Sequence, residues 1–204
     1  MTVVSLKNGT QDGVGLLKIE FSDGSLLHIK KDRYLDGFPG CFDSIHVDRE
    51  ISLDEEESLR FADSCFQVEM AGIRLIARAE QTQAGLSRKL QSRGHDSACV
   101  SAVMSRFIEM DLVNDERYAE RWLRVRLARK GGKVSGPRQL SIALGNRGIG
   151  VEALKGAFSK VLDEEAEFSL LQQFLDKNRL VSGSYSLRGQ LKYEGFSSPV
   201  INRY

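Results

Sequence analysis

LSRKLQSRGH at residues 86–95 recurs as LSIALGNRGI at residues 140–149 and as LRGQLKYEGF at residues 187–196. In each copy a leucine is followed four residues later by a second leucine, and four residues after that by a glycine. Successive copies begin 54 and 47 residues apart. A repeat of this length indicates an architecture in which copies of one small unit stack on their neighbours.

Each interval in the repeat has a structural meaning. Leucines four residues apart lie on one face of a helix, and the glycine ends that helix by adopting a positive φ. The next residue folds back onto the second leucine, as in a Schellman ending. Another amphipathic segment precedes each leucine pair and a further helix follows it, so each unit is expected to contain three short helices. The predicted repeat core consists of Leu86, Leu90, Gly94, Leu140, Leu144, Gly148, Leu187, Leu191 and Gly195, together with the aromatic residues Tyr118 and Trp122.

The helices that follow the repeated phrase show their own apolar stripes. A residue at a fixed distance from the glycine starts each stripe: Val100, Leu154 or Ile201. The first two stripes continue at helical spacing. The segment before the second copy carries a further apolar stripe of its own. We expect these stripes to be core: Val100, Met104 and Phe107; Leu154, Phe158 and Val161; Tyr118, Trp122 and Val125.

The N-terminal part has a different pattern. VGLLKIEF at 14–21 and LLHIKK at 26–31 alternate apolar and polar residues around Asp23-Gly24, which predicts a hairpin. A further short strand is expected at 44–51. Ser52 stands three residues before Glu55, so a capping box should begin a helix there.

The predicted fold is mainly α. It is an elongated tandem array of three-helix, helix-turn-helix-like repeats, preceded by a small β-containing N-terminal segment. The expected parts are a β-rich segment at 1–52, a connecting helix at 53–69, and repeats at 70–113, 114–163 and 164–204, the last with a truncated final helix.

Several classes of protein and of site are disfavoured. No apolar run reaches the roughly 20 residues of a membrane span, and the N-terminus lacks a signal-peptide pattern, so a cytoplasmic protein is expected. The three cysteines, Cys41, Cys65 and Cys99, are widely spaced and should be buried, inert thiols. His28, Cys41 and His46 match no zinc spacing, so neither a metal nor a cofactor is expected.

Charge is unevenly distributed along the chain. Residues 1–69 carry 7 Lys and Arg against 14 Asp and Glu, whereas residues 70–204 carry 22 against 14. Residues 117–147 contain nine basic residues and one acid, an excess beyond what solubility needs. We therefore expect this segment to bind an anion or an acidic partner through Arg117, Arg121, Arg124, Arg126, Arg129, Lys130, Lys133, Arg138 and Arg147.

Two functional classes other than a binding protein are a DNA-binding transcription regulator and an enzyme. The leucine and glycine spacing is also that of a helix-turn-helix, so a DNA-binding transcription regulator is the alternative. Its reading positions, however, would fall in HDSACVSA and IGVEALKG, which carry few base-reading side chains. An enzyme is not expected, because the chain has three histidines, no Gly-rich phosphate loop and no nucleophile elbow.

Finally, LVNDERYAERWLRVRLARK and GPRQLSIALGNRGI, with LSRKLQSRG upstream, resemble the RecX family over about residues 70–204. The resemblance implies a monomeric, non-enzymatic regulator that binds the RecA recombinase filament on single-stranded DNA. It also implies weak, sequence-independent contact with that DNA, inhibition of ATP hydrolysis and strand exchange, and a role in homologous recombination, DNA repair and the SOS response. Two features depart from the family pattern: Gly85 replaces a commonly acidic residue, and the third copy ends at Tyr204, which predicts a loosely packed last unit.

Overall fold

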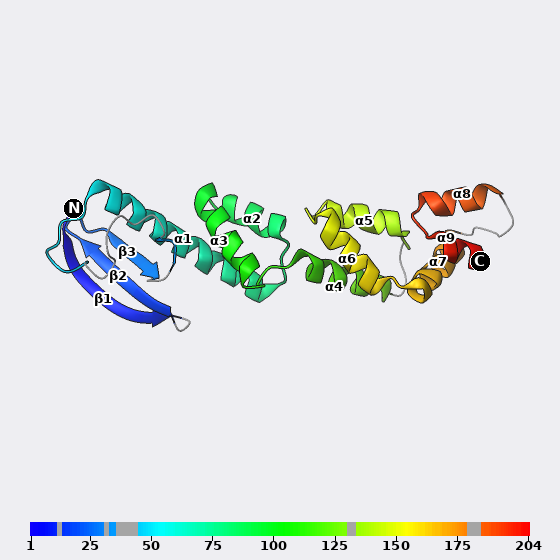
Figure 1. Cartoon of the computed structure of the whole chain (residues 1–204), viewed down its shortest axis with the longest axis horizontal. Coiled ribbons are helices and arrows are strands. Elements are labelled where there is room, and N and C mark those ends of the chain that lie inside the picture. The colour runs from blue at the N-terminus through cyan, green and yellow to red at the C-terminus, as the bar shows by residue number, and fades with distance from the viewer. Residues whose placement is uncertain (12–13, 31–32, 36–44, 130–133, 179–184) are drawn as a thin grey trace. The chain divides into compact units, whose positions relative to one another are not determined.

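The structure is a computed structural model that describes residues 1–11, 14–30, 33–35, 45–129, 134–178 and 185–204. Within these residues the chain is mainly helical, with one small sheet near the N-terminus, as predicted (Figure 1). It divides into two compact units: Met1–Ala79 with Leu86–Leu112, and Glu80–Gly85 with Val113–Tyr204. Lys130 and Lys133, two of the predicted binding residues, lie outside the described residues.

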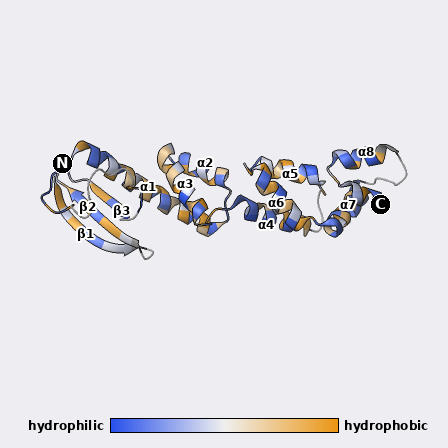
Figure 2. Ribbon diagram, viewed as in Figure 1, coloured by the Kyte–Doolittle hydropathy of each residue, from blue (hydrophilic) through white to orange (hydrophobic). Residues whose placement is uncertain are grey.

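The first unit begins with an antiparallel sheet in the order β1 (Val3–Gln11), β2 (Val14–Phe21) and β3 (Leu26–Lys30). The predicted hairpin is present: Gly24 has a φ of +82°, and Ser25 donates its backbone N–H to Asp23 at 2.9 Å. Hydrophobic and hydrophilic residues alternate along the strands (Figure 2). Because side chains alternate between the faces of a strand, one face is buried, with Leu17, Ile19 and Phe21 at most 5% exposed.

The strand expected at 44–51 is wrong for its described residues. From Ile45 to Ile51 the structure has only an isolated bridge between Glu50 and Thr2. The alternation here buries Ile45 and Ile51 against the sheet without forming a ladder.

The long helix α1 (Leu53–Arg78) begins at the predicted capping box. Glu55 donates its N–H to the Ser52 hydroxyl at 3.3 Å, and Ser52 donates its N–H to the Glu55 carboxylate at 3.0 Å. The helix packs against β3 and then against α3 (Ser97–Glu109). It passes without interruption through the expected division between residues 69 and 70, since no proline or capping signal stops it there.

A buried ionic cluster joins the sheet to α1. The Glu69 carboxylate accepts hydrogen bonds from Lys30 Nζ at 2.8 Å, from Arg33 Nη1 at 2.5 Å and from Tyr34 Oη at 3.1 Å. The Lys30 and Glu69 side chains are only 1% and 3% exposed. Burial, and then the neighbouring Glu69 charge, raises the pKa of the Tyr34 hydroxyl well above its usual value. The sheet is therefore held to the helix by polar contacts as well as by apolar packing.

The repeated phrase forms the same structure three times. It supplies α2 (Gln83–Gln91), α5 (Pro137–Gly145) and α8 (Tyr185–Tyr193), each followed by a glycine with a φ between +84° and +88°. In every copy the residue after the glycine donates its N–H to the second leucine's carbonyl, at distances of 3.1 to 3.5 Å. The glycine donates to the residue after that leucine, which completes a Schellman motif. The predicted helix endings are confirmed, and all six repeat leucines are at most 7% exposed.

The second unit also contains α4 (Asp115–Leu127), α6 (Val151–Val161), α7 (Glu164–Asn178) and α9 (Ser198–Arg203). One hydrophobic core unites α4 through α9. The last helix is short, but Val200 and Ile201 are 0% and 3% exposed, so the expectation of a loosely packed third repeat is wrong. Among the described helices none has both the length and the apolar character needed to cross a membrane.

Candidate interaction surface

Helix α4 places the predicted arginines. Asn114 caps it as expected, accepting the N–H of Arg117 at 3.0 Å, and Asp115 and Glu116 occupy the first turn. The helix buries Asp115, Ala119 and Leu123, which are spaced four residues apart. Because that face is occupied, the positions on the opposite side of the helix point toward solvent.

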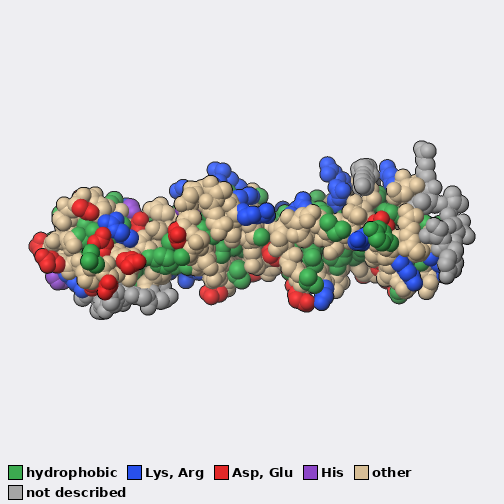
Figure 3. Space-filling view, turned by 90° about the horizontal axis from the view of Figure 1, so that it is seen from above, with side chains coloured by type: hydrophobic (Ala, Val, Ile, Leu, Met, Phe, Trp, Pro, Cys, Tyr) green, Lys and Arg blue, Asp and Glu red, His purple; other side chains and the backbone are tan. Residues whose placement is uncertain are grey.

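Arg117, Arg121 and Arg124 form the stripe predicted from their spacing. Their side chains are 44%, 76% and 62% exposed, so all three are available to a partner. In the face of the second unit that Figure 3 shows, Lys and Arg side chains lie among exposed hydrophobic ones. We call Arg117, Arg121 and Arg124 the arginine stripe.

Two carboxylates contact this stripe, one from a distant part of the sequence and one from α4 itself. Glu80 lies 2.8 Å from Arg117 Nε and 3.7 Å from Arg121 Nη1. Glu120 lies 3.9 Å from Arg124 and 2.9 Å from Lys160 Nζ.

Lys160 also contacts Glu116, at 2.7 Å, and hydrogen bonds from Lys160 to Glu116 and then to Glu120 raise the pKa of its amine. The surface is thus a mixed ionic network, less cationic than the local sequence suggests. Because ion pairs between solvent-exposed side chains are weak, a polyanionic partner can replace these carboxylates at little cost.

The other predicted cations are not part of the stripe. Arg138, on α5, stacks on the ring of Tyr193 with its guanidinium carbon 4.0 Å from the ring centroid. Arg147, in the turn after α5, is half-buried, lies 5.1 Å from the Trp122 centroid and donates to the Ala143 carbonyl. Arg126 is half-buried and Arg129 is exposed near the end of α4. Arg147 therefore has a structural role, whereas Arg138 faces a different part of the surface.

The predicted core stripe on α4 is only partly right. Tyr118 and Trp122 are half-buried and pack on the core of the second unit, but Val125 is 64% exposed. The buried face runs through Ala119 and Leu123, one residue further along than the predicted stripe. A shift of one residue turns the face by about 100°, and this carries Val125 into solvent.

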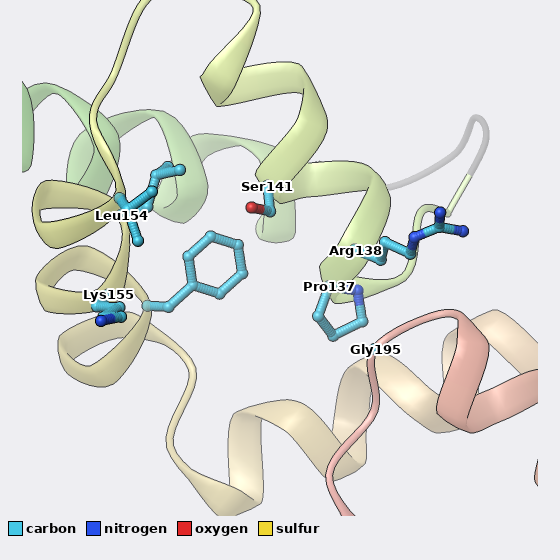
Figure 4. Close-up of a pocket in the computed structure, with 8 residues that line it drawn as sticks. Pro137, Arg138, Ser141, Leu154, Lys155 and Gly195 are labelled. Carbon is cyan, nitrogen blue, oxygen red and sulfur yellow. The ribbon is translucent and has the colours of Figure 1, made fainter.

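A pocket of about 360 Å³ opens on the second unit (Figure 4). It lies between α5 and α6 and reaches the glycine turn after α8. Its lining is mostly apolar, with two cationic residues: Pro137, Arg138, Ser141, Val151, Leu154, Lys155, Phe158 and Gly195. Arg138 and Lys155 lie on opposite sides of it, and the Arg138 guanidinium points away from the cavity.

The fold brings together two cysteines that are far apart in sequence. Cys65 and Cys99 are free and buried, and the Cys99 thiol donates to the Phe61 carbonyl at 3.9 Å. Burial is the main cause that raises the pKa of both thiols. Over the described residues, no group of three or more His, Cys, Asp or Glu side chains is placed to hold a metal ion. Cys41 lies outside those residues.

Sequence reasoning did not identify Glu80, Lys160 or Tyr193 as parts of this surface. Glu80 and Lys160 reach α4 across 37 and 40 residues of sequence. Neither carries a local signal that could have revealed the contact. Tyr193 does follow a repeat leucine by two residues, which places it off the buried face, so its exposure could have been anticipated.

No family model matches the chain, but several known proteins similar to it are named regulatory protein RecX. Regulatory protein RecX of Treponema pallidum is 29% identical over 144 residues, which cover 70% of this chain and 86% of that protein. Regulatory protein RecX of Halorhodospira halophila is 36% identical over 103 residues, or 50% of this chain and 58% of its own length. Regulatory protein RecX of a Mycobacterium species (strain JLS) is 35% identical over 89 residues, which cover 44% of this chain and 47% of that protein.

Solved structures share the fold. A crystal structure of regulatory protein RecX superposes with a TM-score of 0.67 over 98% of this chain and 97% of that one, at 16% identity. The crystal structure of RecX from Lactobacillus salivarius superposes with a TM-score of 0.53 over 70% of this chain and 94% of that one, at 22% identity. The sequence relatives and the solved structures that share this fold are all RecX proteins, and they support membership of this chain in the RecX family.

Proposed function

We propose that this chain is a regulatory protein that binds the RecA filament on single-stranded DNA and inhibits its ATP hydrolysis and strand exchange. The relatives named regulatory protein RecX support the regulatory role. The arginine stripe supports a polyanionic target, because three exposed arginines stand together on one helix face, where a polyanion can compete for them with the carboxylates of Glu80 and Glu120.

In this proposal the chain acts as a monomer, without catalytic activity of its own, in the cytoplasm. The stripe contacts acidic surface on the filament, and the other cations of the second repeat add weak, sequence-independent contacts to DNA phosphates. Bound across the filament, the chain would oppose the conformational changes that accompany ATP hydrolysis.

The transcription-regulator alternative gains no support from the exposed starts of α3 and α6. Helix α6 begins with Val151, which is 65% exposed, and Glu152. Neither side chain donates hydrogen bonds to base edges in the major groove. Selection of one binding site from random duplex DNA would revive this alternative.

The test is co-sedimentation with RecA filaments assembled on single-stranded DNA, together with the RecA ATPase rate. We expect the chain to sediment with the filament and to slow ATP hydrolysis. Changing Arg117, Arg121 and Arg124 together to Glu should weaken binding by about tenfold or more, because it replaces attraction by repulsion.

A matched control makes the same change in charge on exposed arginines of the first unit, Arg74, Arg78 and Arg93. This control should retain binding. An unaltered ATPase rate at stoichiometric protein would reject the function, and equal weakening by both triple variants would reject the stripe as the contact.

A further inference from the structure

Among the described residues of the second unit, the pocket between α5 and α6 is open to solvent. Helix α6 packs on the core chiefly through Ala157, which is fully buried. Its stripe of Val151, Leu154 and Phe158, at helical spacing, lines the cavity instead. Val151 is 65% exposed, while Leu154 and Phe158 are half-buried at the edge of the core. Apolar surface gathered in a cavity of this kind is typical of a binding site.

The turn of the third repeat forms one side of the pocket. A Cβ on Gly195 would lie 2.9 Å from the Arg138 nitrogen, so the turn can approach α5 this closely only with glycine, which also has a φ of +88°. Arg138 donates its backbone N–H to the Glu194 carbonyl at 2.9 Å. The pocket therefore has a preformed wall, since backbone contacts fix the two repeats against each other there.

Cations flank this apolar cavity. The Lys155 side chain is 68% exposed, and its amine pairs with the 87% exposed Glu152 side chain at 2.9 Å. On the other side, the Arg138 guanidinium lies over Tyr193, which is 64% exposed. Both positive charges stay accessible, and a carboxylate beside the opening would gain hydrogen bonds from them.

The repeat itself does not require these charges. At the repeat spacings of 54 and 47 residues, the first copy has Ala84 and the third has Tyr185 where the second has Arg138. The positions that match Lys155 are Ser101 and Asn202. Since the same turn forms in the first and third copies without this pair of cations, their presence around one cavity calls for an explanation beyond folding.

We propose that this pocket binds a peptide segment in which a large apolar side chain is flanked by carboxylates. The apolar side chain enters between Phe158 and Leu154, and the carboxylates pair with Lys155 and Arg138. The volume of about 360 Å³ is at the low end of ligand cavities and suits one or two such side chains. An apolar anchor held by a polar rim is also the usual form of a protein contact hot spot.

A peptide fits this pocket better than a nucleic acid does. A phosphate backbone needs a polar groove that follows it, whereas the lining here is mainly apolar and its cations lie outside the cavity. The identity of the partner rests on the proposed function: the segment would belong to the RecA filament. The pocket's preference for acidic, apolar peptides does not depend on that function.

The first experiment measures fluorescence anisotropy of a fluorescein-labelled peptide, Asp-Glu-Phe-Leu-Asp-Glu, with the full chain. Two matched peptides replace Phe and Leu by Ala, or the acids by their amides. We expect each replacement to weaken binding by about tenfold, because each removes one half of the recognition. Val151→Asp and the double variant Arg138→Glu, Lys155→Glu should weaken it similarly.

Two controls distinguish the pocket from general effects. Val125→Asp alters a valine of equal exposure on α4, and the double variant Lys177→Glu, Arg188→Glu matches the change in charge elsewhere. Both should bind the peptide within about twofold of the unaltered chain. Circular dichroism verifies that every variant is folded.

Equal binding of the three peptides, or unchanged binding by Val151→Asp, would overturn the inference. The inference would also be overturned if Val151→Asp abolished binding of a thymidine oligonucleotide and left binding of the peptide unchanged.

The second experiment repeats RecA co-sedimentation with Val151→Asp, which leaves every arginine in place. Weakened sedimentation supports the pocket as the filament contact, and unchanged sedimentation rejects it while the proposed function stands. If the unaltered chain fails to sediment but discriminates the peptides, the proposed function fails and the pocket's specificity stands.

Discussion

Gly148→Ala tests whether the glycine turns serve only to end helices or also allow neighbouring repeats to approach. Gly94 and Gly148 have nearly the same φ, +84° and +85°. A Cβ on Gly94 would meet nothing within 4 Å, whereas a Cβ on Gly148 would overlap the Cβ of Ala84. The two positions therefore share the conformational cost and differ in the steric one.

The expected magnitudes follow from this difference. Gly94→Ala should lower the free energy of unfolding by about 1–2 kcal/mol, the cost of left-handed backbone for a residue with a Cβ. Gly148→Ala adds an overlap in a packed contact, about 1–3 kcal/mol more, and should cost about 2–5 kcal/mol in total. Urea unfolding followed by circular dichroism measures both. Fluorescence of Trp122, the single tryptophan, reports the second unit.

A double-mutant cycle isolates the contact. Ala84→Gly removes the methyl group that collides, at a cost of about 1 kcal/mol for glycine in a helix. If the overlap is real, the combined variant Ala84→Gly, Gly148→Ala should be more stable than the sum of the two single effects predicts. Strict additivity, or equal losses from Gly94→Ala and Gly148→Ala, would refute the reasoning.

Three further predictions concern buried groups. Glu69→Gln leaves Lys30 and Arg33 without their carboxylate and should cost about 3–5 kcal/mol in urea unfolding, and a loss below 1 kcal/mol would contradict the buried cluster. Burial raises the pKa of Asp115 above its usual 3.8, so the folded state binds the proton more tightly and stability falls as the pH rises from that value through the raised pKa. Asp115→Asn should reduce this fall in Tm, and an unchanged profile of Tm against pH would contradict it. In a Cys41→Ser background, Cys65 and Cys99 should react with a thiol reagent slowly at neutral pH and rapidly in urea, because burial raises the pKa of both; equal rates would contradict their burial.

Features that depend on neighbours in sequence could be predicted. The capping box at Ser52, the Asn114 cap and the three glycine endings each depend on residues at most five positions apart, and all are present. The residue types at those positions determine the local hydrogen bonds whatever the tertiary packing.

Features set by tertiary packing could not be predicted in the same way. The helical periodicity of α4 was clear, but two neighbouring stripes were both plausible core faces, and only packing against the other helices selected Ala119 and Leu123 over Val125. The charge count of residues 117–147 overestimated the local field, because Glu80 comes from outside that segment. The predicted stripe is therefore present, but its ionic partners emerge only from the fold.

In the second and third copies, the contact between the glycine turn and the preceding copy has a consequence for the design of longer chains. Gly148 lies against Ala84, and Gly195 lies against Arg138, the matching position of the next copy. Every added repeat would thus pack on its neighbour through the same contact, in which a glycine turn lies against the first turn of the preceding repeat's phrase helix. Duplicating the second module should extend the protein by a unit of about fifty residues with no new type of interface, as repeat proteins allow. Such a lengthened variant would carry a second cation-flanked cavity, so the number of these cavities per chain could be chosen by design.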